Sequence, residues 1–359
     1  MSFRVAIIGI DHPHGAGWRR ALEGLAGEVE VATIVPRYDG GLASLEERYA
    51  ELPRYESVDA LLEALAGREV QFDGALVCLP NNESPAAATA LARAGRHVLV
   101  EKPLAATAAE LAPLVEAVDE QGVAFQSGYL WRYDEAARRL REMVAQGRFG
   151  PLTSIEMSMV TSDVRRRGPE HYLFDPAYSG GGFFNWLACH WIDLLFYITG
   201  QAVVAVTARV GQFGATNVEV EDGGTAILEL AEGALVTLVG GYWLPRWAGE
   251  SHWCLRGRDR WVHWQPASKQ HGGVLEIHGP QPQWDAMDET FRLPADATPG
   301  YGGAPAAALI RDWIASAAAP AARRCRNTPR SAAATLAVID AIYESSRTGR
   351  RTVCAIEPA

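Results

Sequence analysis

The first 127 residues alternate between short apolar runs and segments whose apolar residues recur at helical spacing. Each apolar run is rich in β-branched residues, as in strands buried on both faces: FRVAIIGI, VEVATIV, FDGALVCLP, RHVLVEKP and VAFQSGY. The segments between them carry helix signals, such as Pro85 in the first turn and Gly95 after the end of the stretch 84–95. Strands that alternate with helices at this spacing predict a parallel sheet with helices on both faces.

The pattern changes after residue 150, where short strands follow one another through hairpin-like turns such as AEG. Helical spacing returns at 182–198, 304–317 and 328–347, an order typical of an α+β domain with a mostly antiparallel sheet. A chain of 359 residues also exceeds the size at which a single core usually stops growing. We therefore predict an α/β protein with a doubly wound, parallel N-terminal domain, 1–124, and an α+β C-terminal domain with a large, open, mostly antiparallel sheet, 125–359.

Charge, cysteine content and hydropathy argue against several classes of protein. The net charge is −10, whereas nucleic-acid binding needs a basic surface. The five cysteines are odd in number, widely spaced and form no CxxC pair, which argues against a disulfide framework or a structural zinc site. The apolar stretch at the N-terminus is too short for a signal peptide or a membrane span. We predict a cytoplasmic protein that binds neither nucleic acid nor a membrane.

The predicted parallel sheet also indicates where a ligand would bind. In open sheets of this kind, ligands lie beyond the carboxyl ends of the strands. The residues that follow the predicted strands are therefore the first candidates for a site: Gly9 to His14, Pro36 and Arg37, Pro80 and Asn81, Glu101 to Pro103, and Gly128 and Tyr129. This selection depends on sheet geometry alone.

Five ordered segments resemble one known family, the Gfo/Idh/MocA family of nicotinamide-dependent sugar and cyclitol oxidoreductases. The segments are AGRHVLVEKPLAATAAEL, GYLWRY, GRFGPL, GGGFFNWLACHWIDLLFYITG and AIYESSRTGRRTV, which together run nearly from end to end. The resemblance implies a Rossmann domain that binds NAD or NADP, and a substrate held against the open sheet of the second domain. It also implies that Lys102 and His190 flank the reacting carbon, and that the peptide bond before Pro103 is often cis.

These two side chains suit the chemistry that the resemblance implies. Oxidation of a secondary alcohol removes a proton as the hydride leaves, and a histidine, with an ordinary pKa of about 6.5, accepts protons near neutral pH. A lysine at the end of a strand can orient the hydroxyl and stabilise the developing alkoxide. Without the resemblance, Lys102 would be interpreted as a surface lysine and His190 as a helix histidine satisfied locally.

The segment around His190 departs from the family pattern, which usually has an Asp four residues before the histidine. Trp186 stands at that position, and Asn185 lies five residues before His190, off the same face of an α-helix. We predict that an amide at this place hydrogen-bonds a sugar hydroxyl, that the indole stacks on a sugar ring, and that Asp193 orients the imidazole. The predicted substrate contacts are Arg132, Tyr172, Asn185, Trp186 and Asp193.

The loop after the first strand departs as well, because GIDHPHG keeps Gly9 but replaces the next two family glycines by Asp11 and His14. Asp11 would repel a pyrophosphate unless it points away or pairs with a histidine, and protonated His12 or His14 would attract it. The same residues have metal-ligating side chains, but a further ligand is missing and no metal is predicted. A third interpretation is that they only shape an unusual turn.

The end of the second strand bears on the choice of cofactor. Arg37 follows Pro36 there and suits the 2′-phosphate of NADP, while Asp39 would favour NAD, so we predict NADP or NAD with a preference for NADP. The predicted cofactor-binding residues are Gly9, Asp11, His12, His14, Arg37, Pro80, Asn81, Glu101 and Lys102.

Three functions are compatible with these features. The first is an NAD(P)-dependent dehydrogenase or reductase that transfers a hydride to or from a secondary alcohol or ketone of a sugar, cyclitol or related polyol. The second is a lyase- or glycosidase-like enzyme that recycles a bound cofactor, and the third is a non-catalytic, ligand-binding member that has lost the dinucleotide. We also predict a homodimer or homotetramer that associates through the open C-terminal sheet.

Overall fold

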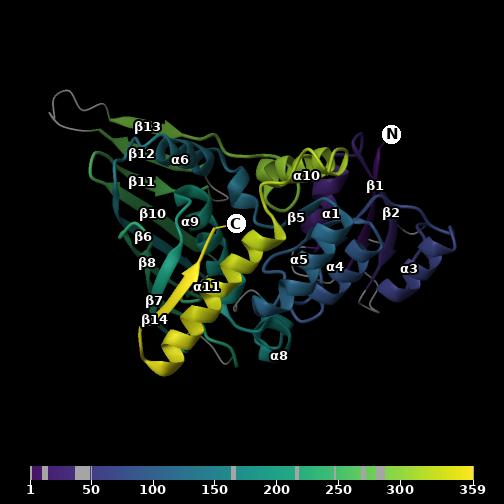
Figure 1. Ribbon diagram of the computed structural model, residues 1–359, viewed down its shortest axis with the longest axis horizontal. Helices are drawn as coiled ribbons and strands as arrows, with labels where there is room; N and C mark the ends of the chain where they lie inside the picture. Colours follow the sequence, from purple (N-terminus) through teal and green to yellow (C-terminus); the bar gives the residue numbers. More distant parts are fainter. Residues whose placement is uncertain are drawn as a thin grey trace. The chain divides into compact units, whose positions relative to one another are not determined.

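The computed structural model describes residues 2–9, 15–36, 49, 51–162, 167–214, 218–245, 248–267, 272–279 and 288–358. The chain divides into two compact units (Figure 1). Unit 1 comprises residues 1–105, 109–133 and 297–333, and unit 2 comprises residues 106–108, 134–296 and 334–359. This division differs from the predicted boundary after residue 124, because the chain returns to unit 1 near its C-terminal end.

Unit 1 contains a sheet of five parallel strands in the order β2-β1-β3-β4-β5, which confirms the predicted parallel sheet. Its strands are β1 (Phe3–Ile8), β2 (Val29–Val35), β3 (Gly74–Val77), β4 (His97–Val100) and β5 (Phe125–Ser127). All residues of β3 and β5 are buried, as are the last four of β1. In β3 and in the last four residues of β1 the apolar run is therefore continuous rather than alternating, as expected for strands covered on both faces.

The helices of unit 1 begin where the sequence provides caps and turns. They are α1 (Gly15–Glu23), α3 (Val58–Ala66), α4 (Ser84–Arg93), η1 (Ala109–Leu111), α5 (Ala112–Gln121), η2 (Leu130–Tyr133) and α10 (Gly303–Ala317). The Ser57 hydroxyl caps α3 by accepting a hydrogen bond from the Ala60 N–H at 3.1 Å. The helix α5 begins at Ala112, because Pro113 has no N–H and fits only a first turn.

Apolar packing explains why α10 belongs to unit 1. Trp313 of α10 is fully buried in the same cluster as Trp18 of α1 and Val5 of β1. The Phe3 ring also lies edge-on against the Trp313 ring, with centroids 5.0 Å apart. The helix α10 begins 300 residues after β1 in the chain, so no local sequence pattern predicts that the two pack together.

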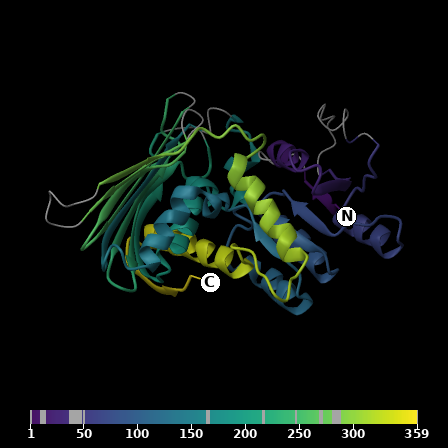
Figure 2. The same ribbon diagram turned by 90° about the horizontal axis from the view of Figure 1, so that it is seen from above.

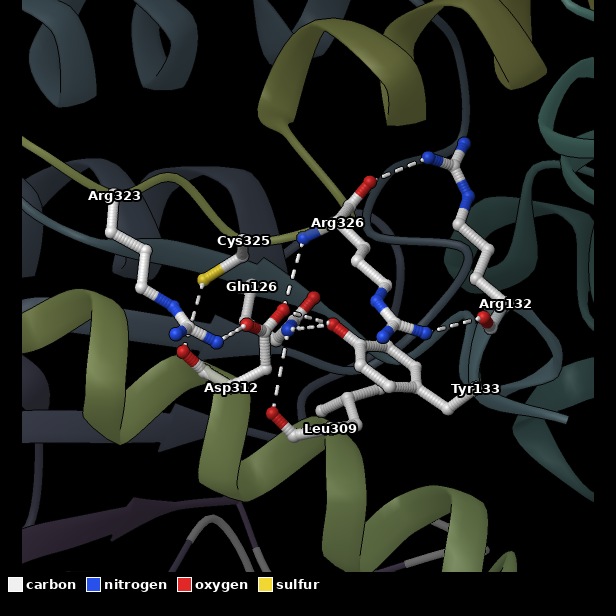
Figure 3. Close-up of polar contacts among 8 residues, drawn as sticks. All are labelled: Gln126, Arg132, Tyr133, Leu309, Asp312, Arg323, Cys325 and Arg326. Carbon is white, nitrogen blue, oxygen red and sulfur yellow. Dashed lines mark hydrogen bonds and ion pairs between the residues drawn. The ribbon is translucent and has the colours of Figure 1, made fainter. Parts of the chain in front are cut away.

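A buried polar network holds the segment after α10 to η2 (Figure 3). The Tyr133 hydroxyl donates to Asp312 Oδ2 at 2.5 Å and accepts from Gln126 Nε2 at 2.7 Å. Asp312 also accepts hydrogen bonds from the Arg323 guanidinium at 2.6 Å and from the Arg326 N–H at 3.1 Å. Burial raises the pKa of Tyr133. Burial alone would also raise the pKa of Asp312, but the hydrogen bonds from Tyr133 and Arg323 hold it below its ordinary value.

Unit 2 contains a sheet of nine strands in the order β13-β12-β11-β10-β6-β9-β8-β7-β14. Its strands are β6 (Leu152–Thr161), β7 (Val203–Gly211), β8 (Gly223–Leu230), β9 (Leu235–Gly241), β10 (Gly249–Gly257), β11 (Trp261–Gln265), β12 (Val274–His278), β13 (Glu289–Arg292) and β14 (Thr352–Ile356). Among the described strands of this sheet only β6 and β9 pair in parallel, so the predicted mostly antiparallel sheet is confirmed. The sequence analysis did not predict β10, β12, β13 or β14.

Helices gather on one face of this sheet (Figures 1 and 2). They include α6 (Glu135–Ala145), α9 (Cys189–Thr199) and α11 (Pro329–Thr348), whose first five residues belong to unit 1. Shorter elements are η3 (Tyr172–Phe174), α8 (Pro176–Ser179) and the π-helix η4 (Phe184–Ala188). Apolar side chains including Ile227, Leu235 and Val239 stay exposed on β8 and β9.

The buried cap of α6 makes stability depend on pH. Asp134 caps α6 by accepting from the Ala137 N–H at 3.0 Å, and burial raises the pKa of Asp134 to about 6 from 3.8. Because the folded pKa exceeds the unfolded one, the contribution of Asp134 to stability is greatest below pH 4 and falls as the pH rises to about 6. We expect Asp134→Asn, which keeps the acceptor and removes the charge, to stabilise the protein at pH 8 by about 1–3 kcal/mol and to change little at pH 4. Thermal unfolding at both pH values checks this; a variant less stable than the wild type at pH 8 would show that the charge favours the helix N-terminus.

Candidate functional site

The carboxyl edge of the unit 1 sheet begins at Gly9, directly after β1. Gly9 has a φ of +73°, and a Cβ there would lie 2.4 Å from the Cys78 carbonyl oxygen. Glycine is therefore required by the close approach of β1 to the residue after β3. The other predicted residues of this loop, Asp11, His12 and His14, lie outside the residues that the structure describes, as does Arg37 after β2.

The residues that follow β3 and β4 form the described part of this edge. Pro80 and Asn81 are buried after β3, and Glu101 and Lys102 are buried after β4, with Lys102 0% exposed. Complete burial contradicts the interpretation of Lys102 as a surface lysine. The peptide bond between Lys102 and Pro103 is cis, as the family resemblance implied.

Glu101 is held by the core of unit 1. Its carboxylate accepts a hydrogen bond from the Trp18 indole N–H at 2.5 Å. Gly128, which follows β5, leaves room for this carboxylate, because a Cβ there would lie 2.7 Å from Glu101 Oε2. Glu101 therefore fixes the end of β4 directly before Lys102.

In unit 2, the glycine-rich turn packs against the protein itself. A Cβ at Gly180 would lie 2.3 Å from the Ala106 Cβ, and one at Gly181 would lie 2.1 Å from the Tyr343 hydroxyl. At Gly182 a Cβ would lie 1.9 Å from the carbonyl oxygen of Glu221. The three glycines are thus explained by internal packing, without a ligand.

Glu221 caps the helical segment that follows this turn. Its carboxylate accepts hydrogen bonds from the N–H groups of Gly182 at 2.6 Å and Phe184 at 3.0 Å, and from the Tyr343 hydroxyl at 2.9 Å. Burial raises the pKa of Glu221, and these hydrogen bonds oppose the rise. The sequence analysis missed Glu221, since a cap contributed from nearly 40 residues along the chain leaves no local pattern.

The helix that carries His190 begins with a π-helical turn. Its first part, η4, is a π-helix, and the Cys189 N–H donates to the Phe184 carbonyl, five residues back. The sequence analysis assumed α-helical spacing, which puts Trp186 on the face of His190 and Asn185 off it. A turn closed by an i→i+5 bond departs from that spacing, so the α-helical assumption does not hold for residues 184–188.

The predicted substrate residues fall into different surroundings. Asn185, Trp186, His190 and Asp193 lie on one continuous helical segment of unit 2, and all four are buried. The Asn185 amide donates to the carbonyls of Ser179 at 2.9 Å and Ala106 at 3.3 Å.

The other two predicted substrate residues lie elsewhere. Tyr172 is half-buried in η3, and its ring centroid lies 4.8 Å from that of His171. Arg132 belongs to unit 1, where its guanidinium donates to the Arg326 carbonyl at 2.7 Å and is buried (Figure 3). Within the part of the chain that the structure describes, no three His, Cys, Asp or Glu side chains are grouped to hold a metal, and no helix is long and apolar enough to cross a membrane.

Comparison with known proteins identifies the family. Residues 3–129 match the model of an oxidoreductase family with an NAD-binding Rossmann fold, and residues 137–261 match the Gfo/Idh/MocA C-terminal domain. The chain belongs to the Gfo/Idh/MocA family. The Rossmann and C-terminal models correspond to the parallel and antiparallel sheets described above.

Two curated relatives illustrate the sequence similarity. D-xylose 1-dehydrogenase (NADP(+)) 2 of Haloferax volcanii is 28% identical over 57% of this chain and 62% of its own length. Myo-inositol 2-dehydrogenase of Thermotoga maritima is 28% identical over 46% of both chains. The chain thus spans about half to three fifths of the length of these relatives.

Solved structures of family members share the fold over the whole chain. Levoglucosan dehydrogenase in complex with NADH and L-sorbose superposes with a TM-score of 0.86 at 17% identity, covering 99% of both chains. Aldose-aldose oxidoreductase from Caulobacter crescentus, complexed with glycerol, has a TM-score of 0.80 at 22% identity and covers 99% of this chain and 100% of its own. At this identity the likeness establishes the fold alone.

Proposed function

We propose that this family member is an NAD(P)-dependent oxidoreductase that transfers a hydride to or from a secondary alcohol or ketone of a sugar, cyclitol or related polyol. The observation that carries the proposal is the fully buried Lys102, placed after β4 at the edge where parallel sheets of this kind bind ligands. Lysines are seldom completely buried in proteins unless they are paired. The names of the curated relatives, a xylose and an inositol dehydrogenase, support the substrate class.

The side chains of this edge fit a nicotinamide dinucleotide. Gly9 allows the tight turn after β1, while Asn81 and Lys102 supply buried polar groups after β3 and β4. We propose that these residues hold the cofactor together with Asp11, His12, His14, Arg37, Pro80 and Glu101. When bound, the cofactor supplies the hydride acceptor or donor. Arg37 and the name of the xylose dehydrogenase favour NADP.

The proton is handled by this chain's own residues. We assign to His190 the exchange of a proton with the substrate hydroxyl, and to the Lys102 ammonium a hydrogen bond to the same oxygen as its charge develops. Trp186, Tyr172, Asp193 and Arg132 remain proposed substrate contacts. For Arg132 the hydrogen bond to Arg326 supports a structural role as well.

Subunit association through the unit 2 sheet is part of the proposal. Exposed Ile227, Leu235 and Val239 provide an apolar surface on β8 and β9, which a second copy would cover in a homodimer or homotetramer. We place the enzyme in the cytoplasm because its cysteine pattern suits a reducing compartment.

A cofactor titration tests the proposal. The purified protein is mixed with NADH or NADPH while quenching of tryptophan emission and enhancement of nicotinamide emission are followed. Nucleotide released on denaturation is measured first. Micromolar binding followed by hydride transfer to members of a polyol panel is the expected result. Tightly carried nucleotide that turns over substrate without a net change in NAD(P)H would favour the recycled-cofactor alternative, and no binding at millimolar cofactor would overturn both.

A further inference from the structure

A buried tryptophan of α1 contacts the residue that precedes Lys102. The Trp18 indole N–H donates to Glu101 Oε2 at 2.5 Å, although the two residues are 83 positions apart in the chain. Trp18 is 0% exposed and Glu101 is 2% exposed, so this hydrogen bond lies inside unit 1. Hydrogen bonds to a carboxylate are roughly twice as strong as those between neutral groups, so the contact holds the chain directly after β4.

Gly128, which follows β5, restricts the same two residues. A Cβ at Gly128 would lie 2.7 Å from Glu101 Oε2 and 3.0 Å from the Lys102 backbone nitrogen. The Gly128 N–H also donates to the Val100 carbonyl at 2.8 Å. The backbone after β5 therefore passes against the chain that carries Lys102, with no space for a side chain between them.

A second buried tryptophan shows that the core does not require an indole hydrogen bond. Trp313 of α10 is 0% exposed in the same apolar cluster as Trp18. Its indole N–H is buried and has no hydrogen-bond partner among the described residues. The core of unit 1 thus accommodates an indole with or without a paired N–H, whereas the N–H of Trp18 is directed at the carboxylate beside the proposed catalytic lysine.

We infer that Trp18 and Gly128 are positioning residues, which act through Glu101 to fix where the Lys102 ammonium lies at the carboxyl edge of the unit 1 sheet. The inference rests on the proposed function, in which this ammonium hydrogen-bonds the substrate oxygen. Consecutive Cα atoms are only about 3.8 Å apart, so a shift of Glu101 also displaces Lys102. Because a misplacement of about 1 Å can cost about 100-fold in rate, fixing the lysine is a sufficient role for one buried hydrogen bond.

The sequence analysis did not select Trp18, because it considered the residues that follow the strands and Trp18 lies within a helix. Its partner is also far away in the chain, so no local spacing connects the two residues.

The decisive comparison is between Trp18→Phe and Trp313→Phe. Both variants keep an aromatic ring and remove an indole N–H from the same core, but only W18F removes a donor to Glu101. We expect kcat for the polyol to fall by about 10- to 100-fold in W18F while Kd for the cofactor changes by less than about threefold. In W313F both quantities should stay within about threefold of the wild type.

Two outcomes of this comparison contradict the inference. Tm should fall in both variants, and an equal loss of kcat in W18F and W313F would assign the effect to core packing. A loss in W18F that is confined to cofactor binding would show that the Glu101 carboxylate serves the dinucleotide rather than Lys102. Either result overturns the positioning role.

Gly128→Ala tests the same arrangement without removing a hydrogen-bond donor. The added methyl group would press on the Glu101 carboxylate and on the backbone of Lys102, so we expect kcat to fall by at least about tenfold. Gly27→Ala is the matched control, since a Cβ at Gly27 would meet no atom within 4 Å, and it should leave kcat unchanged. A G128A enzyme as active as G27A would contradict the inference.

Crystal structures of the wild type, W18F and W313F test the positioning without reference to activity. We expect Lys102 Nζ to move by about 1 Å or more in W18F and to keep its place in W313F. An unmoved Lys102 in W18F would exclude the positioning role, even if that variant were impaired as an enzyme. If the wild type transfers no hydride but Lys102 moves in W18F alone, the proposed function fails while the positioning role stands.

Discussion

Replacement of Lys102 by Ala is expected to lower kcat for the polyol substrate by about 10²- to 10⁴-fold. The Lys102 side chain is completely buried at the carboxyl edge of the unit 1 sheet. A water molecule in place of its ammonium would have to be buried as well, which costs free energy. The cofactor should still bind within about threefold of the wild-type affinity if the lysine acts on the reacting oxygen. Steady-state kinetics and the fluorescence titration together measure both quantities.

Two controls keep this result interpretable. Lys102→Met retains most of the buried stem, and it should lose kcat to the same extent as K102A with a smaller change in Tm. Arg93→Ala removes an exposed cation from the last turn of α4 and should leave kcat unchanged. A fall of less than tenfold in K102M, with the cofactor bound normally, would assign Lys102 a structural role. A loss confined to cofactor binding would place the lysine at the dinucleotide instead.

Replacement of Asp312 by Ala is expected to lower the free energy of unfolding by about 3 kcal/mol. The carboxylate accepts hydrogen bonds from the Tyr133 hydroxyl, the Arg326 N–H and the Arg323 guanidinium, and the first two donors lie within the protein (Figure 3). Removing the carboxylate takes the acceptor away from these two buried donors, so the free energy spent on desolvating them is no longer offset by its hydrogen bonds. Urea denaturation of the wild type and D312A measures the loss.

The pH dependence of this loss has a definite sign. The pKa of Asp312 is lowered in the folded protein from its ordinary 3.8, so its contribution is fully present above pH 4 and disappears as the pH falls through the folded value. The difference between the wild type and D312A should therefore shrink on acidification. Arg323→Ala is the matched control: its guanidinium is about half exposed, so its loss should cost much less than the loss of the Asp312 carboxylate. A D312A variant as stable as R323A would contradict the role of the network.

Patterns over a few neighbouring residues predicted several strands and helix starts. Short β-branched runs predicted the five parallel strands, and Pro85 predicted the start of α4. The same pattern predicted that Lys102 lies at the end of a strand. The strand β10, GESHWCLRG, was missed because its charged, histidine and glycine residues give no clean alternation.

The tertiary structure alone decided features that depend on partners far apart in the sequence. Trp313 and Asp312 place α10 in unit 1, although residues 134–296 of unit 2 separate it from the strands it covers. The glycines 180–182 make room for Ala106, Tyr343 and Glu221. The π-turn of residues 184–188 likewise was not predicted, since composition does not distinguish it from ordinary helix.

Sequence alone thus predicted the strands of unit 1 and several helix starts, because strand and helix propensity act over a few residues. Which residues of these elements meet was decided by packing and buried hydrogen bonds between distant parts of the chain.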